Sequence, residues 1–187
     1  LLALVVANGY SAFSTPDIDA RSKAMAGAIT ANPLNSSAVV ANPAHLDSFD
    51  SISVTINAQP MSRGLSDGSI LRISGSGVVP VLGILGAGIS ANALLVQSGG
   101  STIYSEIEAA VGVGKKLPML EALSFGGTAI IQMKNVDDSE LEGSVSFPVT
   151  INATVGVAYV LNDEIKIGLA GKNLIGMKTA SGDSEDS

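Results

Sequence analysis

Two glutamates stand two residues apart in an alternating stretch of the sequence, at Glu106 and Glu108. Residues at i and i+2 of a strand point to the same face, so the two carboxyl groups would lie near each other. Paired carboxylates can carry out general acid and base catalysis on glycosidic bonds. Such catalysis needs a third polar group that tunes one of the two pKa values, and the sequence around the pair offers none. The two side chains could otherwise line a water-filled lumen or a polar sheet surface.

Three groups of glycines invite comparison with a phosphate-binding loop. They are Gly83-x-x-Gly86-x-Gly88, Gly112-x-Gly114-Lys115 and Gly126-Gly127. None has the spacing G-x-x-x-x-G-K-[ST] of a nucleotide-binding loop, and the second group lies inside an alternating strand. Glycines at these places would instead let strands bend or accept a plug against the sheet. We therefore predict no nucleotide site.

The other polar residues give little support for a catalytic or metal centre. The run Asp137-Asp138-x-Glu140-x-Glu142 lacks the glycine turn and the ligand order of an EF-hand, which favours a solvated loop over a calcium site. The chain has no cysteine and a single histidine, His45. Thiolate metal sites and a Ser-His-Asp relay therefore lack their components. We predict that the protein is not an enzyme and that it holds no cofactor and no metal.

A turn around Asn42 is the more informative polar feature. An asparagine amide placed before a proline can close an Asx turn, and Pro43 follows Asn42 directly. We predict that Asn42 fixes the shape of this segment, and that the neighbouring His45 forms a hydrogen bond from the segment to the surrounding wall.

The composition restricts the class of protein. The 187 residues carry a net charge of −7, so a surface that binds nucleic acid is not expected. Hydrophobic residues make up 46% of the chain, while charged residues make up 14% against about 25% in average proteins. No run of about 18 apolar residues forms a transmembrane helix. Either a soluble β protein buries the apolar residues, or alternating strands turn them toward lipid.

The two ends of the sequence have the composition of segments outside the fold. Residues 1–14 have the apolar core of a signal peptide, and Ala12 and Ser14 fit its cleavage pattern. A short buried strand is the alternative interpretation of the first residues. Residues 179–187 are acidic and polar, as in a loop whose following strand is missing or in a native acidic tail.

Residues 15–50 do not have the pattern of a strand. Asp17 or Asp19 can cap a helix over 20–31, and the Asn-Pro pair at 32–33 would end that helix. A second short helical or extended piece follows at 38–41. We interpret 15–50 as a compact plug with short helices.

Residues 51–178 alternate with a period of two. The apolar rows occur in 51–58, 103–115, 123–134, 151–161 and 165–175, and the less regular stretch 78–96 has the features of a bent strand pair or a buried hairpin. Strands of about ten residues exceed the usual length in soluble proteins and match the length that crosses a bilayer. The predicted fold is an all-β, antiparallel transmembrane β-barrel with about seven or eight strands present and a helical N-terminal plug. Against it, aromatic residues make up only 4% of the chain, so Tyr104, Phe125, Phe147 and Tyr159 would form a sparse interfacial girdle.

Two segments of the plug carry a family resemblance. Residues 19–28, Asp-Ala-Arg-Ser-Lys-Ala-Met-Ala-Gly-Ala, and residues 36–46, Ser-Ser-Ala-Val-Val-Ala-Asn-Pro-Ala-His-Leu, resemble the N-terminus of mature FadL-type and PorV-type outer-membrane proteins. The segments 112–126 and 155–174 also look like strand, turn and strand units of these barrels. The resemblance implies ligand or plug roles for Arg21, Met25, Gly27, Asn42, Pro43 and Ala44. Ala26 replaces the first glycine of the family's usual pair, and Ala41 replaces an aromatic residue. The family's barrels have more strands than fit here, so we expect a fragment.

The resemblance also implies a function. FadL-type relatives pass hydrophobic small molecules, such as long-chain fatty acids or aromatic hydrocarbons, across the outer membrane of Gram-negative-type bacteria. PorV-type relatives imply a shuttle or anchoring role in protein secretion. The expected partners are outer-membrane lipid and either a hydrophobic small molecule or a secreted protein. The alternative from a different class is a secreted β-sandwich or a structural subunit of a surface fibre.

Overall fold

The computed structural model describes residues 19–33, 35–61, 68–81, 85–138, 143–146, 148–162 and 164–178. The predicted signal-peptide remnant, residues 15–18 and the acidic end at 179–187 lie outside these ranges. Two short α-helices and a 3-10 helix precede the strands: α1 (Ala20–Ala24), α2 (Ala38–Ala41) and η1 (Pro43–Ser48). The strands are β1 (Ser53–Met61), β2 (Gly68–Val81), β3 (Leu85–Ser98), β4 (Ser101–Leu117), β5 (Leu120–Asp138), β6 (Gly143–Ser146), β7 (Thr150–Val160), β8 (Lys166–Gly171) and β9 (Met177–Lys178).

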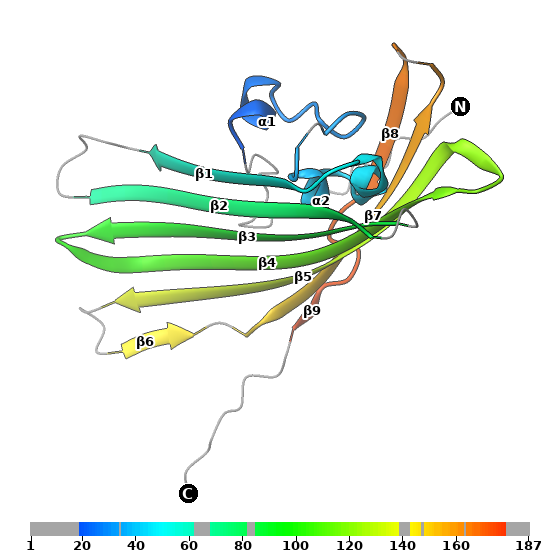
Figure 1. Ribbon diagram of the computed structural model, residues 1–187. Helices are drawn as coiled ribbons and strands as arrows, with labels where there is room; N and C mark the ends of the chain where they lie inside the picture. The colour runs from blue at the N-terminus through cyan, green and yellow to red at the C-terminus, as the bar shows by residue number, and fades with distance from the viewer. Residues whose placement is uncertain are drawn as a thin grey trace, which may run out of the picture.

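The strands form one antiparallel sheet that curls into a half-barrel (Figure 1). Its order is β1-β2-β3-β4-β5-β7-β8, so each strand of this path pairs with the next one along the chain apart from the short β6. The strand β6 pairs with β5, and β9 pairs with β7. The predicted all-β, antiparallel architecture is confirmed, and seven strands make up the main path.

Several strands are longer than the alternation predicts. The strand predicted over 103–115 extends over 17 residues in β4, and the one predicted over 123–134 extends over 19 residues in β5. The irregular stretch at 78–96 belongs to a hairpin of two 14-residue strands, β2 and β3. The strand predicted over 165–175 is interrupted, because residues 172–176 leave the ladder between β8 and β9. Within this interruption Asn173 has a φ of 56°, and the Leu174 N–H donates to the Ala153 carbonyl at 3.0 Å.

The two faces of the sheet differ in chemistry. We call the face that contacts α2 and η1 the inner face; it carries the even-numbered residues of β2, β4, β5 and β7 and the odd-numbered residues of β1. Serine, threonine, glycine and charged residues dominate it. Apolar residues on the opposite, outer face stay exposed, with Val54 at 68%, Ile89 at 65% and Leu169 at 70% of full accessibility. All described strands belong to one sheet, so no second sheet faces these residues within the described part of the chain.

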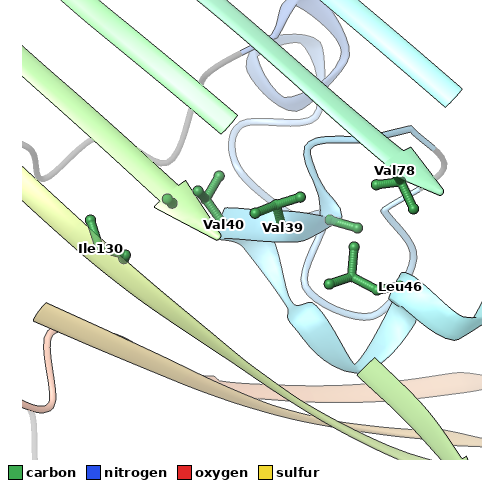
Figure 2. Close-up of a cluster of buried hydrophobic side chains, with 7 residues drawn as sticks. Val39, Val40, Leu46, Val78 and Ile130 are labelled. Atoms are coloured by element: carbon green, nitrogen blue, oxygen red, sulfur yellow. The ribbon is translucent and has the colours of Figure 1, made fainter. Parts of the chain in front are cut away.

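The short helices α2 and η1 pack on the inner face, and together with α1 they form the plug, residues 19–33 and 35–50 (Figure 1). Figure 2 shows Val39, Val40 and Leu46 of the plug gathered with Val78 of β2 and Ile130 of β5. Val39 and Leu46 have no solvent exposure. The best-buried apolar cluster of the described residues therefore lies between the plug and the wall.

The first helix is shorter than predicted. Asp19 caps it as expected, with its side chain accepting from the Ser22 N–H at 2.6 Å, but the helix ends at Ala24 instead of continuing to 31. Ala26 (φ 50°) and Gly27 (φ 79°) adopt the left-handed conformation. The Gly27 N–H donates to the Ser22 carbonyl and the Ala26 N–H to the Lys23 carbonyl, which is the Schellman pattern of a helix end. Ala26 and Gly27, rather than the proline at 33, stop the helix. None of the described helices is long and apolar enough to cross a membrane.

Candidate functional site

Four glycines form one row across the inner face. Gly86 of β3 pairs with Gly114 of β4, Gly114 pairs with Gly126 of β5, and Gly126 pairs with Gly156 of β7. Because the side-chain period of a strand is two, all four would point their missing side chains at the plug. The row is a strip of bare backbone that runs perpendicular to four consecutive strands of the main path.

The plug fills the space above this row. A Cβ built on any of the four glycines would come closer than 3.0 Å to plug atoms, a distance that Cβ atoms essentially never show. The atoms in question are the Leu46 carbonyl oxygen above Gly86, the Pro43 carbonyl above Gly114 and Gly126, and the Asn42 side-chain oxygen above Gly156. Most of these are backbone atoms, which cannot rotate away as the end of a side chain can. The glycines are therefore required for the plug to seat.

Asn42 connects the plug to itself and to the wall. Its side-chain oxygen accepts from the Ala44 N–H at 3.1 Å, which closes the predicted Asx turn before Pro43. Its amide nitrogen donates to the Thr30 carbonyl at 2.8 Å and to the Val157 carbonyl of β7 at 3.2 Å. The residue has no solvent exposure. Both the oxygen and the nitrogen of the Asn42 side chain therefore have hydrogen-bond partners, so this polar group can be buried without an unsatisfied donor or acceptor.

Three of the six candidate residues meet at the glycine row, and three do not. Asn42, Pro43 and Ala44 are buried in the turn that covers the row. Arg21 is exposed on α1, and Met25 at the end of that helix is 38% exposed. Gly27 forms the second residue of the left-handed helix end, where its N–H donates to the Ser22 carbonyl of α1. The six residues indicated by the resemblance therefore lie in two separate places, the turn that covers the glycine row and the α1 segment with its C-terminal end.

Hydroxyl and carboxylate groups fasten the plug at other points of the inner face. Ser36 donates from its hydroxyl to the Ser76 carbonyl at 3.0 Å and lies 2.8 Å from the Thr55 hydroxyl. The Thr128 hydroxyl of β5 donates to the Val39 carbonyl at 2.6 Å. The Asp47 carboxylate accepts from the Lys116 backbone N–H of β4 at 2.7 Å. The plug is thus tied to β1, β2, β4, β5 and β7.

His45 binds a different partner from the predicted one. Its ring donates to the Thr30 backbone carbonyl, which belongs to the plug and not to the wall. Burial disfavours the charged imidazolium and lowers the pKa of His45, while the hydrogen bond to Thr30 opposes this shift and the charge of Lys166 adds to it. The histidine therefore stiffens the plug and is neutral near pH 7.

The two glutamates lie on the inner face, as lining residues of a lumen or polar surface would. Glu106 is 2% exposed; it accepts from the Tyr104 hydroxyl and lies 3.9 Å from the Lys134 ammonium. Glu108 accepts from the Gln132 amide at 2.8 Å. Tyr104 shares this inner face, so its predicted place in an outer aromatic girdle is wrong. The residues with described side chains hold no group of three or more His, Asp or Glu arranged for a metal ion; the side chains of the acidic run at 137–142 lie outside the described residues.

Sequence reasoning missed three contributors to the site. Leu46 was noted only as part of the family motif, although it is the largest fully buried side chain among the described residues. The glycine groups were recognised, but their alignment into one row was not. Thr128 gave no signal, because one threonine in an alternating strand is ordinary.

Comparison of the chain with protein-family models, with curated proteins and with solved structures finds no match.

Proposed function

We propose that this chain forms wall and plug of an outer-membrane β-barrel protein that passes hydrophobic small molecules, of the long-chain fatty acid or hydrocarbon type. The observation that carries the proposal is the reversed distribution of polarity across the sheet. A soluble sheet turns its apolar face toward a core, whereas this one turns polar residues, glycines and the plug inward and leaves the apolar face uncovered.

The outer face forms a continuous apolar band. On β5 the outer residues from Phe125 to Met133 are all apolar or glycine, and on β4 the same holds from Ile107 to Val113. Neighbouring strands add apolar residues in the same rows: Val54, Ile56, Ile73, Val79, Ile89, Ile151 and Val155. Polar residues bracket the band on β4, at Ser105 and Lys115.

The height of the band agrees with a bilayer. From Phe125 to Met133 the chain covers about 27 Å along the strand at roughly 3.4 Å per residue. A tilt of about 40° reduces this to about 21 Å, near the apolar band of about 25 Å in outer-membrane barrels. Phe125 and Tyr159 lie at the same end of the band, next to the row of Lys115, where an aromatic girdle would be expected.

Membrane localisation is tested by expression of the full-length protein. The proposal expects the protein in the outer-membrane fraction, with heat-modifiable migration in detergent. A protein that stays in the soluble periplasmic fraction and never shows heat-modifiable migration would contradict it, and would favour the secreted structural subunit instead.

The role of the plug in passage is tested with Asn42→Ala. This substitution removes three hydrogen bonds in a buried site, and each buried group that it leaves unsatisfied costs about 1–3 kcal/mol. The Thr30 carbonyl keeps the His45 ring as a donor. We expect the barrel to assemble and its permeability to a hydrophobic probe to change. Asn57→Ala is the matched control, because Asn57 lies on the inner face of β1 outside the glycine row.

The same experiment separates transport from the PorV-like alternative. If Asn42→Ala and wild type show equal flux while secretion of a cargo protein is lost, the plug serves secretion or anchoring. If flux changes in Asn42→Ala and not in Asn57→Ala, the plug controls passage of small molecules.

A further inference from the structure

The plug reaches the wall at a second place, apart from the glycine row. Gly168 of β8 also lies under plug backbone, because a Cβ built on it would come within 2.4 Å of the Thr30 carbonyl oxygen. The ammonium of Lys166, on the same strand, donates to the Asn32 side-chain oxygen at 3.4 Å. We call residues 28–33, which include both plug partners, the strap. In Figure 1 the strap belongs to the loop between α1 and α2 that reaches toward β8.

The loop that carries the strap is closed at its base. The buried Asp19 carboxylate caps α1 through the Ser22 N–H and also accepts from the Asn35 side-chain amide at 3.1 Å. This bond joins the two ends of the loop 19–35, as in an Ω-loop. The left-handed residues 26–27 then turn the chain before the strap begins. The base of the loop can therefore stay in place while the strap moves.

The strap is held to the wall less firmly than the turn at 42–46, which we call the seated turn. The seated turn lies on four glycines, donates to β7 through the Asn42 amide and packs Leu46 into the buried apolar cluster. The strap lies on one glycine and accepts its hydrogen bond from β8 in an exposed position. Inside the plug, Asn42 and His45 both donate to the Thr30 carbonyl. Segments with fewer buried contacts open at a lower free energy than the rest of a protein, so the strap should open before the seated turn.

The strap also borders a cavity of about 500 Å³ between the plug and the wall. Asn32 and Pro33 of the strap contribute to its lining, together with Phe49 of the plug and residues of β4, β5, β7 and β8. The volume falls in the range of about 300–1,000 Å³ that is usual for small-molecule sites. Because the strap forms one side of this cavity, displacement of the strap would open the cavity toward β8.

We propose that residues 28–33 are the moving part of the plug, and that they swing off Gly168 to open the cavity while the seated turn stays on the glycine row. The step changes only non-covalent contacts. When the Thr30 carbonyl leaves, the Asn42 amide keeps its bond to the Val157 carbonyl of β7, so the seated turn loses no hydrogen bond to the wall. That the open cavity admits a hydrophobic small molecule rests on the proposed function, whereas the opening itself does not.

Opening is measured first by thiol labelling, which does not depend on transport. The chain has no cysteine, so a single introduced thiol reports on one place. Ile29→Cys reports on the strap, where Ile29 is 2% exposed, and Ser37→Cys reports on the buried start of α2. Each is combined with Gly168→Ala or with the matched control Gly171→Ala. Gly171 lies on the same strand, and the nearest atom to its Cβ would be a methyl carbon of the flexible Leu174 side chain at 3.3 Å.

We expect Gly168→Ala to accelerate the labelling of Ile29→Cys about tenfold, because the new methyl group displaces the strap backbone. The labelling of Ser37→Cys should stay within about twofold, as for a site that is independent of the strap. Gly171→Ala should leave both rates unchanged. Heat-modifiable migration establishes that each variant is folded. An unchanged rate at Ile29→Cys in folded Gly168→Ala, or an equal acceleration at Ser37→Cys, would overturn the proposal.

Cross-links test the same division of the plug without a change at any glycine. Asn32→Cys with Lys166→Cys joins the strap to β8 through a reducible bifunctional thiol reagent, because cysteine is shorter than the lysine that it replaces. Ser36→Cys with Ser76→Cys joins the α2 segment to β2 by a disulfide, since the two hydroxyl oxygens lie 2.7 Å apart. We expect the strap cross-link to abolish the flux of a hydrophobic probe and a reductant to restore it. The disulfide at the α2 segment should leave the flux unchanged.

The two readouts separate this inference from the proposed function. If the wild type passes no hydrophobic probe, the proposed function fails, while the labelling rates still decide whether the strap opens. If the wild type passes the probe and the strap cross-link leaves the flux intact, the strap is not the moving part. Loss of flux with both cross-links would mean that the whole plug moves, which would also overturn the inference.

Discussion

The inner and outer faces of this sheet are formed by the same strands but differ in the size and polarity of their side chains. On the inner face, the side chains become smaller toward the plug, until only glycine remains in the row under Pro43 and Leu46. On the outer face, branched apolar residues such as Val54, Val111 and Ile131 remain in the open. A face that must admit a second piece of backbone needs glycine, whereas a face in contact with lipid needs only apolar side chains. Because side chains alternate with a period of two, one strand can carry glycine on its inner face and apolar side chains on its outer face.

The largest expected effect tests whether the outer face contacts lipid. Val111→Lys places a charge in the middle of the apolar band and should cost about 2–4 kcal/mol of unfolding free energy in phospholipid vesicles. The matched control is Ser105→Lys on the same strand and face, where the cost should be about 0–1 kcal/mol near the interface. Denaturant titration of the refolded variants measures both, and equal costs at the two positions would remove lipid as the neighbour of this face.

The inner face is tested by adding one methyl group. In Gly126→Ala the Cβ would meet the Pro43 carbonyl group at less than 3.0 Å, so plug seating should weaken by about 1–3 kcal/mol. In the control Gly127→Ala the nearest atom to the Cβ is the Thr154 oxygen at 4.0 Å, and the methyl faces outward. Since the chain has no cysteine, a Ser37→Cys background gives a single thiol in a buried part of the plug. The maleimide labelling of this thiol should accelerate about tenfold in Gly126→Ala and stay unchanged in Gly127→Ala. Equal labelling rates in the two variants would contradict the claim that the plug needs glycine at this position to pack on the wall.

Acid should loosen the plug but leave the outer face unaffected. The pKa of His45 is lowered below 6.5 in the seated plug, so a released plug binds a proton more readily. The His45 contribution to the stability of the plug on the inner face is therefore fully present above pH 6.5, and it is lost as the pH falls from 6.5 through the lowered pKa. The labelling rate of the Ser37→Cys thiol, divided by that of a thiol introduced at the exposed Ser51, should rise between pH 7.5 and pH 5. In His45→Gln the ratio of labelling rates should not rise between pH 7.5 and pH 5. A rise of the same size in this variant would show that a group other than His45 causes it.

The smallest effect concerns the helix end of the plug, away from both faces. Ala26 holds a left-handed φ of 50°, which costs an alanine roughly 1 kcal/mol or more relative to glycine. Relief of about 1–2 kcal/mol of strain exceeds the roughly 0.4–1 kcal/mol that glycine costs through the entropy of the unfolded chain, so Ala26→Gly should stabilise the protein by up to about 1 kcal/mol in a urea titration. Ala28→Gly should instead be neutral or destabilising, because Ala28 is not among the described residues with positive φ. Stabilisation by both substitutions would indicate a general effect of glycine and not relief at Ala26.

Much of the inner face could be predicted one strand at a time. The alternation placed Glu106 and Glu108 on one face, and the Asx turn at Asn42 followed from a single Asn-Pro pair. The helix over 20–31 was predicted too long, because alanine rarely adopts the left-handed conformation that Ala26 holds at the helix end. The partner of His45 was also missed, since an acceptor in the plug and one in the wall cannot be told apart without their positions.

Local chemistry by itself determined which residues form strands, which side chains share a face and where the plug turns, since these depend on neighbours a few positions apart. The glycine row was decided only by the tertiary structure. Gly86 and Gly114 meet because the hairpin between them turns near Gly100. Gly126 joins them because the next hairpin, which turns at 118–119, has a register shift between Lys116 and Leu117. A slip of one residue in either register would move the glycines to the outer face. The seat of the plug is therefore a property of strand register, which pairs residues far apart in the chain.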